Sequence, residues 1–103
     1  MPFETATSTK ASAIRPGALA RIDIGGARIA VANVDGVFYA FDDACTHEQC
    51  SLAEGDLEGA KVICACHGAE FDVRTGDVLA PPATEPLRVY PVRVADDILH
   101  IEV

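Results

Sequence analysis

Two short stretches, Cys45-Thr46-His47 and Cys64-Ala65-Cys66-His67, concentrate side chains that bind metals. Each stretch offers one thiolate and one imidazole, from Cys45 and His47 in the first and from Cys64 and His67 in the second. Sixteen residues separate the two stretches. Two soft sulfur ligands and two nitrogen ligands suit either a zinc ion or an iron–sulfur cluster.

Two further cysteines, Cys50 and Cys66, are left over, one beside each pair. Ordinary buried thiols are one alternative, although chance rarely places two Cys/His pairs at loop positions. A structural zinc site is another. Zinc fingers and ribbons, however, usually begin with a C-x₂₋₄-C pair and often carry both histidines on a helix. Here each pair mixes Cys with His, so the pattern is unusual for zinc.

Turn residues recur at short intervals along the rest of the chain, which leaves no room for a substantial helix. Asp35-Gly36 between two β-prone runs is a strong hairpin signal, because both residues tolerate a positive φ. Asp96-Asp97 separates two further runs in the same way. We therefore predict an all-β domain with short strands and at most a single helical turn over 51–57. The predicted strands are 28–34, 37–41, 61–64, 70–73, 78–79, 87–94 and 98–103.

The segment 42–87 carries all four cysteines and two of the three histidines. We interpret it as an insertion between N-terminal and C-terminal strands that pair with each other. The whole chain, 1–103, is then one domain with basal strands in 1–41 and 88–103. Loops inserted into a rigid scaffold are a common place for chemistry. The third histidine, His100, falls on the polar side of the last predicted strand and is expected at the surface.

The chain is acidic: 8 Lys and Arg stand against 16 Asp and Glu among 103 residues, a formal net charge of −8. A protein that binds nucleic acid usually carries a basic patch, which a chain with this net charge is not expected to have. The negative charge instead favours electrostatic attraction of the protein to basic partners. No apolar run approaches the roughly 20 residues of a membrane-spanning helix. Residues 1–14 lack the features of a signal peptide. We expect a cytoplasmic protein that binds neither nucleic acid nor membranes.

Four acidic residues lie around the first Cys/His pair, which leaves two interpretations open. Negative charge there is either an ordinary solvated loop or part of a docking surface. The four residues are Asp42, Asp43, Glu48 and Glu54.

The two Cys/His pairs together resemble the ligand motif of the Rieske [2Fe–2S] proteins, C-x-H followed after sixteen residues by C-x-x-H. Residues 29–40 are also similar to the hairpin that precedes the first ligand loop in Rieske-type ferredoxins, and 71–76 to the turn after the second. Pro81 and Pro82 fall where the family has a proline loop over the cluster. The resemblance implies a Rieske-type fold of short antiparallel strands in stacked sheets, with 42–87 as the cluster-binding subdomain.

In this family pattern, Cys45 and Cys64 would hold one iron of a single [2Fe–2S] cluster, and His47 and His67 the other. Neutral imidazoles in place of two thiolates leave the oxidised site without net charge, so an added electron meets less repulsion. Such centres have potentials between about −150 and +300 mV. The positions expected beside the cluster are Gln49, Ala65, Gly68, Ala69, Phe71, Pro81 and Pro82.

Two features of the resemblance point to different branches of the family. High-potential Rieske proteins of cytochrome bc complexes have hydroxyl donors where this chain has Ala69 and Phe71, so we predict a potential at the low end of the range. Cys50 and Cys66 match the pair that forms a loop-bridging disulfide in that same branch. We expect the disulfide here too, shielded from reductants by the flanking loops, rather than two reduced thiols.

The resemblance implies a one-electron carrier, not a complete enzyme: the ferredoxin of a ring-hydroxylating dioxygenase system in aromatic hydrocarbon catabolism. A flavin-containing ferredoxin reductase would reduce it, and a terminal Rieske non-haem iron oxygenase would receive the electrons. One alternative is the small Rieske subunit of another reductase, such as a nitrite reductase. The others are a Cys₂His₂ zinc-binding structural module and a redox sensor that uses Cys50 and Cys66.

Overall fold

The computed structural model describes residues 4–46, 50–66, 68–81, 83 and 85–102. Within these residues the chain forms short strands and two single turns of 3₁₀ helix, which confirms the predicted all-β class. No helix in this part of the chain is both long and apolar enough to cross a membrane. The elements are β1 (Glu4–Lys10), η1 (Ala11–Ala13), β2 (Leu19–Ile24), β3 (Ala27–Val34), β4 (Val37–Asp42), η2 (Leu52–Glu54), β5 (Asp56–Glu58), β6 (Lys61–Ile63), β7 (Glu70–Asp72), β8 (Val78–Ala80), β9 (Val89–Tyr90), β10 (Val92–Ala95) and β11 (Ile98–Glu102).

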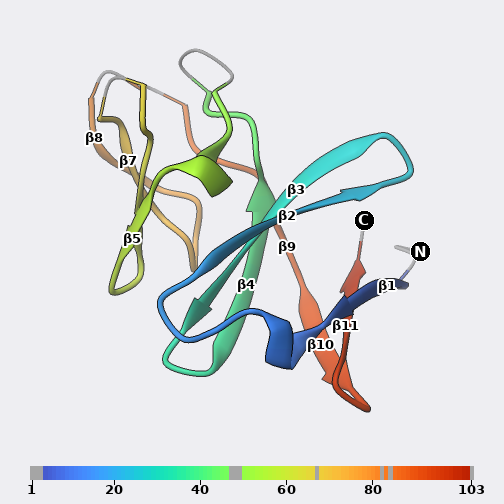
Figure 1. The fold of residues 1–103 in the computed structure, drawn as a ribbon. Coiled ribbons are helices and arrows are strands. Elements are labelled where there is room, and N and C mark those ends of the chain that lie inside the picture. The colour runs from blue at the N-terminus through green and yellow to red at the C-terminus, as the bar shows by residue number, and fades with distance from the viewer. Residues whose placement is uncertain (1–3, 47–49, 67, 82, 84, 103) are drawn as a thin grey trace.

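The strands form three antiparallel sheets, ordered β1-β11-β10, β2-β3-β4-β9 and β5-β6-β7-β8 (Figure 1). The first two sheets combine strands from both ends of the chain. The third consists of four consecutive strands from the middle of the sequence and lies to one side of the others in Figure 1. The subdomain limits at 42 and 87 stay a prediction.

The predicted hairpins are confirmed by backbone geometry at their turns. Asp35 and Gly36 have φ values of 50° and 91° between the paired residues Val34 and Val37. Two positive φ values give the turn a twist that matches the flanking strands. Asp96 and Asp97, with φ values of 51° and 63°, join β10 to β11 in the same way.

The structure differs from the sequence prediction at several elements. The predicted strands do not include β1, an edge strand that pairs with β11, nor β2 and β5, and the helical turn η1 was not predicted either. The predicted strand 87–94 is divided at Pro91: β9 pairs with β4, and β10 pairs with β11. Proline has no N–H to donate to a sheet, so the chain changes from one sheet to the other at this residue.

Two buried clusters share strand β3, in which every residue from 29 to 33 is buried. One cluster contains Leu99 and Ile101 of β11, which are fully buried as the predicted alternation of that strand requires. The other joins β3 and β4 to the β5–β8 sheet through Phe41 and Phe71. Because β3 contributes to both clusters, the sheet with β5–β8 is packed firmly on the rest of the domain.

Candidate metal centre

Cys45, the cysteine of the first Cys/His pair, lies in a loop that main-chain hydrogen bonds close at its base. The chain leaves β4 and returns at Ser51, where an isolated bridge pairs Ala44 with Ser51. The N–H of Cys45 donates to the carbonyl of Cys50 at 2.9 Å, and the N–H of Leu52 donates to the carbonyl of Asp43 at 2.8 Å. Cys45 therefore sits on the fixed part of the loop.

Cys64, the cysteine of the second pair, lies in a tighter loop between β6 and β7. The N–H of Cys64 donates to the carbonyl of Ala69 at 2.8 Å, and the N–H of Gly68 donates to the carbonyl of Cys64 at 3.1 Å. Gly68 has a φ of 77°, which suits glycine and lets the chain turn directly before Ala69 and β7.

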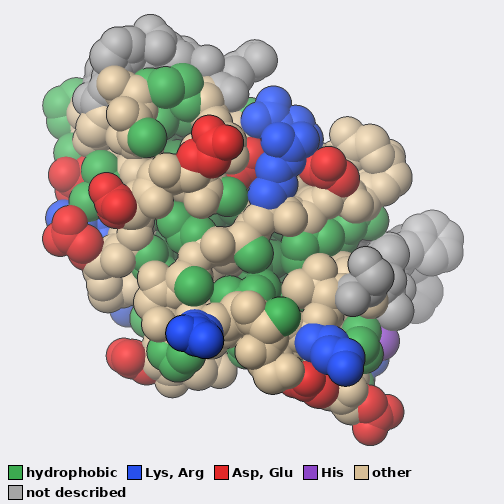
Figure 2. Space-filling view, in the orientation of Figure 1, with side chains coloured by type: hydrophobic (Ala, Val, Ile, Leu, Met, Phe, Trp, Pro, Cys, Tyr) green, Lys and Arg blue, Asp and Glu red, His purple; other side chains and the backbone are tan. Residues whose placement is uncertain are grey.

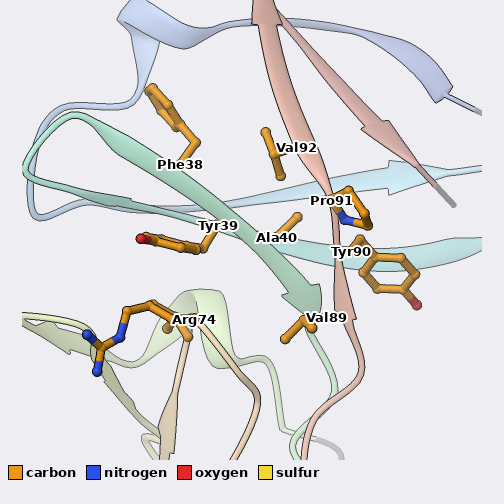
Figure 3. A pocket seen from close by; sticks show the side chains of 9 residues that line it. Phe38, Tyr39, Ala40, Arg74, Val89, Tyr90, Pro91 and Val92 are labelled. Carbon is orange, nitrogen blue, oxygen red and sulfur yellow. The ribbon is translucent and has the colours of Figure 1, made fainter.

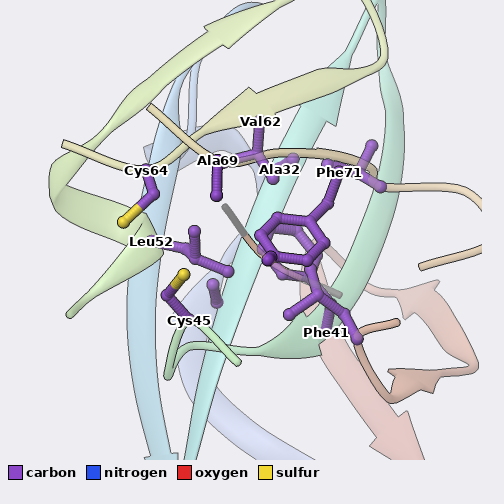
Figure 4. Close-up of a cluster of buried hydrophobic side chains, with 12 residues drawn as sticks. Ala32, Phe41, Cys45, Leu52, Val62, Cys64, Ala69 and Phe71 are labelled. Atoms are coloured by element: carbon purple, nitrogen blue, oxygen red, sulfur yellow. The ribbon is translucent and has the colours of Figure 1, made fainter. Parts of the chain in front are cut away.

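Cys45 and Cys64 reach the same buried cluster from these two loops, and neither belongs to a disulfide (Figure 4). Their exposed fractions are 1% and 3%. Leu52, Ala69 and Phe71 belong to the same cluster and are themselves fully or almost fully buried. Two buried thiols on separate, closed loops fit the sulfur half of a site with two cysteine and two histidine ligands.

Cys50 and Cys66 are joined by a disulfide that ties the first loop to the second, with a Cα–Cα distance of 6.5 Å. This is the pairing that the resemblance implied. The prediction that the flanking loops shield the disulfide from reductants is wrong for Cys66, which is exposed. Cys50 is partly buried. The sulfur atoms of Cys50, Cys64 and Cys66 all lie within 4.8 Å of one another. The disulfide therefore lies directly beside one of the two buried thiols.

A third segment, of which the structure describes residues 81, 83 and 85–87, is attached to the first loop. The hydroxyl of Thr46 donates to the carbonyl of Glu85 at 2.8 Å. Ala83 and Leu87 are buried in the same cluster as the two thiols, and the N–H of Leu87 donates to the carbonyl of Gly76 at 2.8 Å. The segment that carries the predicted proline loop is thus held against the thiol-bearing core.

The other predicted site residues fall into three groups. Ala69 and Phe71 are buried, whereas Ala65, Gly68 and Pro81 are exposed. The predicted ligands His47 and His67 lie outside the described residues, as do Gln49 and Pro82, so their roles stay predictions.

Asp43 is a residue whose role the sequence analysis missed. Its side chain is fully buried, so it is neither part of a solvated loop nor part of a docking surface. The carboxylate accepts hydrogen bonds from Ser51 and Ala53 and is paired with Arg28. No local signal distinguishes Asp43 from the neighbouring Asp42, because its partner Arg28 lies fifteen residues away on β3.

The neighbouring Asp42 accepts a hydrogen bond from the hydroxyl of Tyr90. Partial burial, together with this bond, raises the pKa of Tyr90 to about 12. The Arg88 guanidinium lies 5.2 Å from the centre of the Tyr90 ring. Asp42 thus ties the end of β4 to β9 rather than facing the cysteine loops.

A separate groove of about 450 Å³ lies between β4, β9 and the turn after β7 (Figure 3). Its lining includes Phe38, Tyr39, Arg74 and Tyr90. The Arg74 guanidinium is held by the carboxylate of Asp72 through contacts of 3.1 and 2.9 Å, which raise the pKa of Arg74. The described cysteines do not line this groove, so the candidate metal centre lies elsewhere.

The sequence matches the model of one protein family, "Rieske [2Fe-2S] domain", over residues 5–91. The biphenyl dioxygenase ferredoxin subunit of Pseudomonas sp. (strain KKS102) is 45% identical over 92 residues, covering 85% of this chain and 84% of that protein. The biphenyl 2,3-dioxygenase ferredoxin component of Rhodococcus jostii (strain RHA1) is 44% identical over 87 residues, covering 84% and 81%.

Solved structures show the same fold. The ferredoxin of carbazole 1,9a-dioxygenase from Nocardioides aromaticivorans IC177 superposes with a TM-score of 0.91 at 26% identity, covering 96% of both chains. A chain from a complex of reduced oxygenase and oxidised ferredoxin in carbazole 1,9a-dioxygenase superposes with a TM-score of 0.87 at 38% identity. That match covers 92% of this chain and 98% of the other.

Proposed function

Because this chain belongs to the family of Rieske [2Fe–2S] domains, we propose that it is the electron-carrying ferredoxin of a ring-hydroxylating dioxygenase system. The observation that carries the proposal is the pair of buried cysteines, Cys45 and Cys64, at the bases of two loops in one core. The relatives support it, because those quoted above are ferredoxin components of dioxygenases.

In the proposed site, the thiolates of Cys45 and Cys64 hold one iron, and His47 and His67 hold the other. When bound, the [2Fe–2S] cluster accepts and releases one electron. The protein's part is to fix both loops and to keep water away from the sulfur ligands. The buried side chains of Leu52 and Phe71 support that role.

The proposed potential lies at the low end of the Rieske range, about −150 mV. Hydrogen bonds from hydroxyl groups to cluster or cysteine sulfur stabilise the reduced state. The two positions where hydroxyl groups would act are Ala69 and Phe71, which have none. Both are buried in the cluster that contains Cys45 and Cys64, so neither position is open to solvent.

The proposed partners are a flavin-containing ferredoxin reductase and a terminal Rieske non-haem iron oxygenase, all in the cytoplasm. A solved relative comes from a complex of oxygenase and ferredoxin, which supports the second partner. The net charge of −8 favours brief, salt-sensitive contacts with basic surfaces. On the face shown in Figure 2, acidic and basic side chains both lie at several separate places, so the proposed steering rests on the overall charge and not on one acidic patch of this face.

The test is to purify the protein and to measure iron, sulfide and zinc content, visible absorption and low-temperature EPR. We expect two irons and two sulfides per chain, a Rieske-type EPR signal and a midpoint near −150 mV by redox titration. A colourless protein with stoichiometric zinc would overturn the proposal in favour of a zinc module. A large reductase subunit that remains bound through purification would instead favour the small-subunit alternative.

A functional assay completes the test. The protein is added to a ferredoxin reductase, NADH and the terminal oxygenase of a biphenyl dioxygenase, and hydroxylated product is measured. Product formation that depends on the added protein and falls at high salt supports the proposal. A protein that receives electrons from the reductase but never supports turnover with any ring-hydroxylating oxygenase contradicts the assignment to this kind of system.

A further inference from the structure

We propose that Asp43 is the positioning residue of the first ligand loop, and that its buried carboxylate governs how firmly the cluster is held. This inference rests on the function proposed above, because it takes Cys45 as a ligand. Its structural basis is a set of contacts between described residues.

The two oxygens of the Asp43 carboxylate have different partners, one set just after the first loop and the other on β3. Oδ1 accepts from the hydroxyl of Ser51 at 3.0 Å and from the N–H of Ala53 at 2.9 Å. Oδ2 accepts from Nη2 of Arg28 at 3.3 Å. One side chain therefore connects the residues just after the loop to the start of strand β3.

The backbone of Asp43 makes the same two connections. Its N–H donates to the carbonyl of Arg28 at 3.0 Å, and its carbonyl accepts from the N–H of Leu52 at 2.8 Å. Asp43 thus occupies the point where the loop meets the sheet, with its backbone and its side chain bonded to both sides.

The Asp43 carboxylate is fully buried, whereas the Arg28 side chain is 40% exposed. A buried carboxylate is strongly unfavourable unless it is paired and hydrogen-bonded, and hydrogen bonds to an ionised acceptor are stronger than neutral ones. Loss of the charge or of the donors therefore removes interactions that the loop base needs. The effect is local, because every partner lies at the start of β3 or between Ser51 and Ala53.

The interactions reach the proposed ligand through adjacent pairs. Directly beyond the Asp43–Leu52 hydrogen bond come the bridge between Ala44 and Ser51 and the hydrogen bond from Cys45 to Cys50. If the contacts of Asp43 were weakened, the hydrogen bond between Asp43 and Leu52 would break first, and the pairs nearer to Cys45 would follow. The disulfide then passes the change to Cys66 on the second loop.

The experiment compares Asp43→Asn with Asp72→Asn in the full-length holoprotein. The first substitution keeps the size of the side chain but removes the charge and turns an amide N–H₂ group, a donor, toward Arg28. Asp72 is the matched control: it also pairs with an arginine, Arg74, but it lies on β7 before the 74–77 turn, away from the first loop. Ser51→Ala, which removes one donor and keeps the charge, is the milder variant if Asp43→Asn does not fold.

Three readouts are taken well below the unfolding temperature of every variant. We expect Asp43→Asn to lose iron to a chelator about tenfold faster than the wild type, or more, as loss of a buried charge-assisted hydrogen bond implies. Its Rieske EPR g-values should shift, and dithiothreitol should reduce its Cys50–Cys66 disulfide faster. Asp72→Asn should match the wild type in all three, and Ser51→Ala should show a smaller change in the same direction.

The outcomes separate this inference from the proposed function. If the wild type holds the cluster and Asp43→Asn and Ser51→Ala match Asp72→Asn in all three readouts, the positioning role is overturned. If the wild type holds no cluster, the proposed function fails instead. The rate of disulfide reduction in the cluster-free protein then still decides the role of Asp43: a faster rate in Asp43→Asn supports it, and an equal rate overturns it.

Discussion

The backbone N–H of Cys64 donates to the carbonyl of Ala69 at 2.8 Å, which places Ala69 at the base of the same loop as this proposed ligand. The position that carries a hydroxyl in high-potential Rieske proteins is therefore rigidly connected to a thiol-bearing residue. In this chain it is occupied by a methyl group, and it is 1% exposed.

Ala69→Ser and Phe71→Tyr are each predicted to raise the midpoint potential. Each variant adds a hydroxyl donor inside the buried cluster that contains Cys45 and Cys64, and a hydrogen bond to sulfur stabilises the added electron. The measurement is a redox titration followed by EPR. Phe41→Tyr is the control for Phe71→Tyr, because Phe41 is equally buried in the same cluster and gains the same hydroxyl group on β4 instead of on β7. Unchanged or lower potentials in both test variants would contradict the hydroxyl argument.

Cys45→Ser and Cys64→Ser are each predicted to abolish the cluster, because a serine oxygen is a harder and poorer ligand for cluster iron than a thiolate sulfur. His100→Ala should keep it, since His100 lies on β11 in the sheet with β1 and β10. Iron and sulfide content and visible absorption are measured for all three variants. A full complement of iron in either cysteine variant would show that the proposed ligand set is wrong.

Gly76→Ala is predicted to destabilise the domain by about 2–4 kcal/mol. Gly76 has a φ of +85°, and a Cβ there would overlap the carbonyl oxygen of Leu87, a backbone atom that cannot move aside as a flexible side chain could. Gly25→Ala is the control, with a φ of +54° and no atom within 4 Å of the added Cβ. Its expected cost is about 1 kcal/mol. Urea denaturation of both variants checks the difference, and equal losses would contradict it.

The raised pKa of Tyr90 predicts that the folded protein loses stability at alkaline pH. Burial and the hydrogen bond to Asp42 raise the pKa of Tyr90 to about 12 in the folded state, above about 10 in the unfolded state. The folded state therefore binds this proton more tightly, so the contribution is complete below pH 10 and is lost as the pH rises toward 12. Urea denaturation of wild type and Tyr90→Phe at pH 9 and pH 11.5 should show a smaller loss in the variant. Equal losses would mean that Tyr90 contributes nothing to the pH dependence.

The hairpins and the four cysteines could be placed from the sequence because their signals are local. Asp35-Gly36 sets its own backbone geometry, and each Cys/His pair is recognised from two to four consecutive residues. Strand β1 could not be predicted, because an edge strand is fixed by pairing with β11 far along the chain. The burial of Asp43 was missed for the same reason: Arg28, one of its partners, lies fifteen residues away on another strand.

The disulfide between Cys50 and Cys66 is predicted to slow the loss of the cluster. Removing the disulfide with the double variant Cys50→Ala/Cys66→Ala should leave the cluster in place but make its loss faster, because only the ligands of the cluster then join the two loops. A disulfide that closes a loop of about 15 residues contributes about 3 kcal/mol in the chain-entropy model. The measurement is bleaching of visible absorption in the presence of a chelator.

Dithiothreitol provides the second arm of this experiment. Cys66 is exposed, so the reductant should reach the disulfide and bring the wild type to the bleaching rate of the double variant. The double variant itself should not respond to dithiothreitol, which separates loss of the disulfide from direct reduction of the cluster. Equal bleaching rates of wild type and double variant without reductant would mean that the disulfide does not help to retain the cluster.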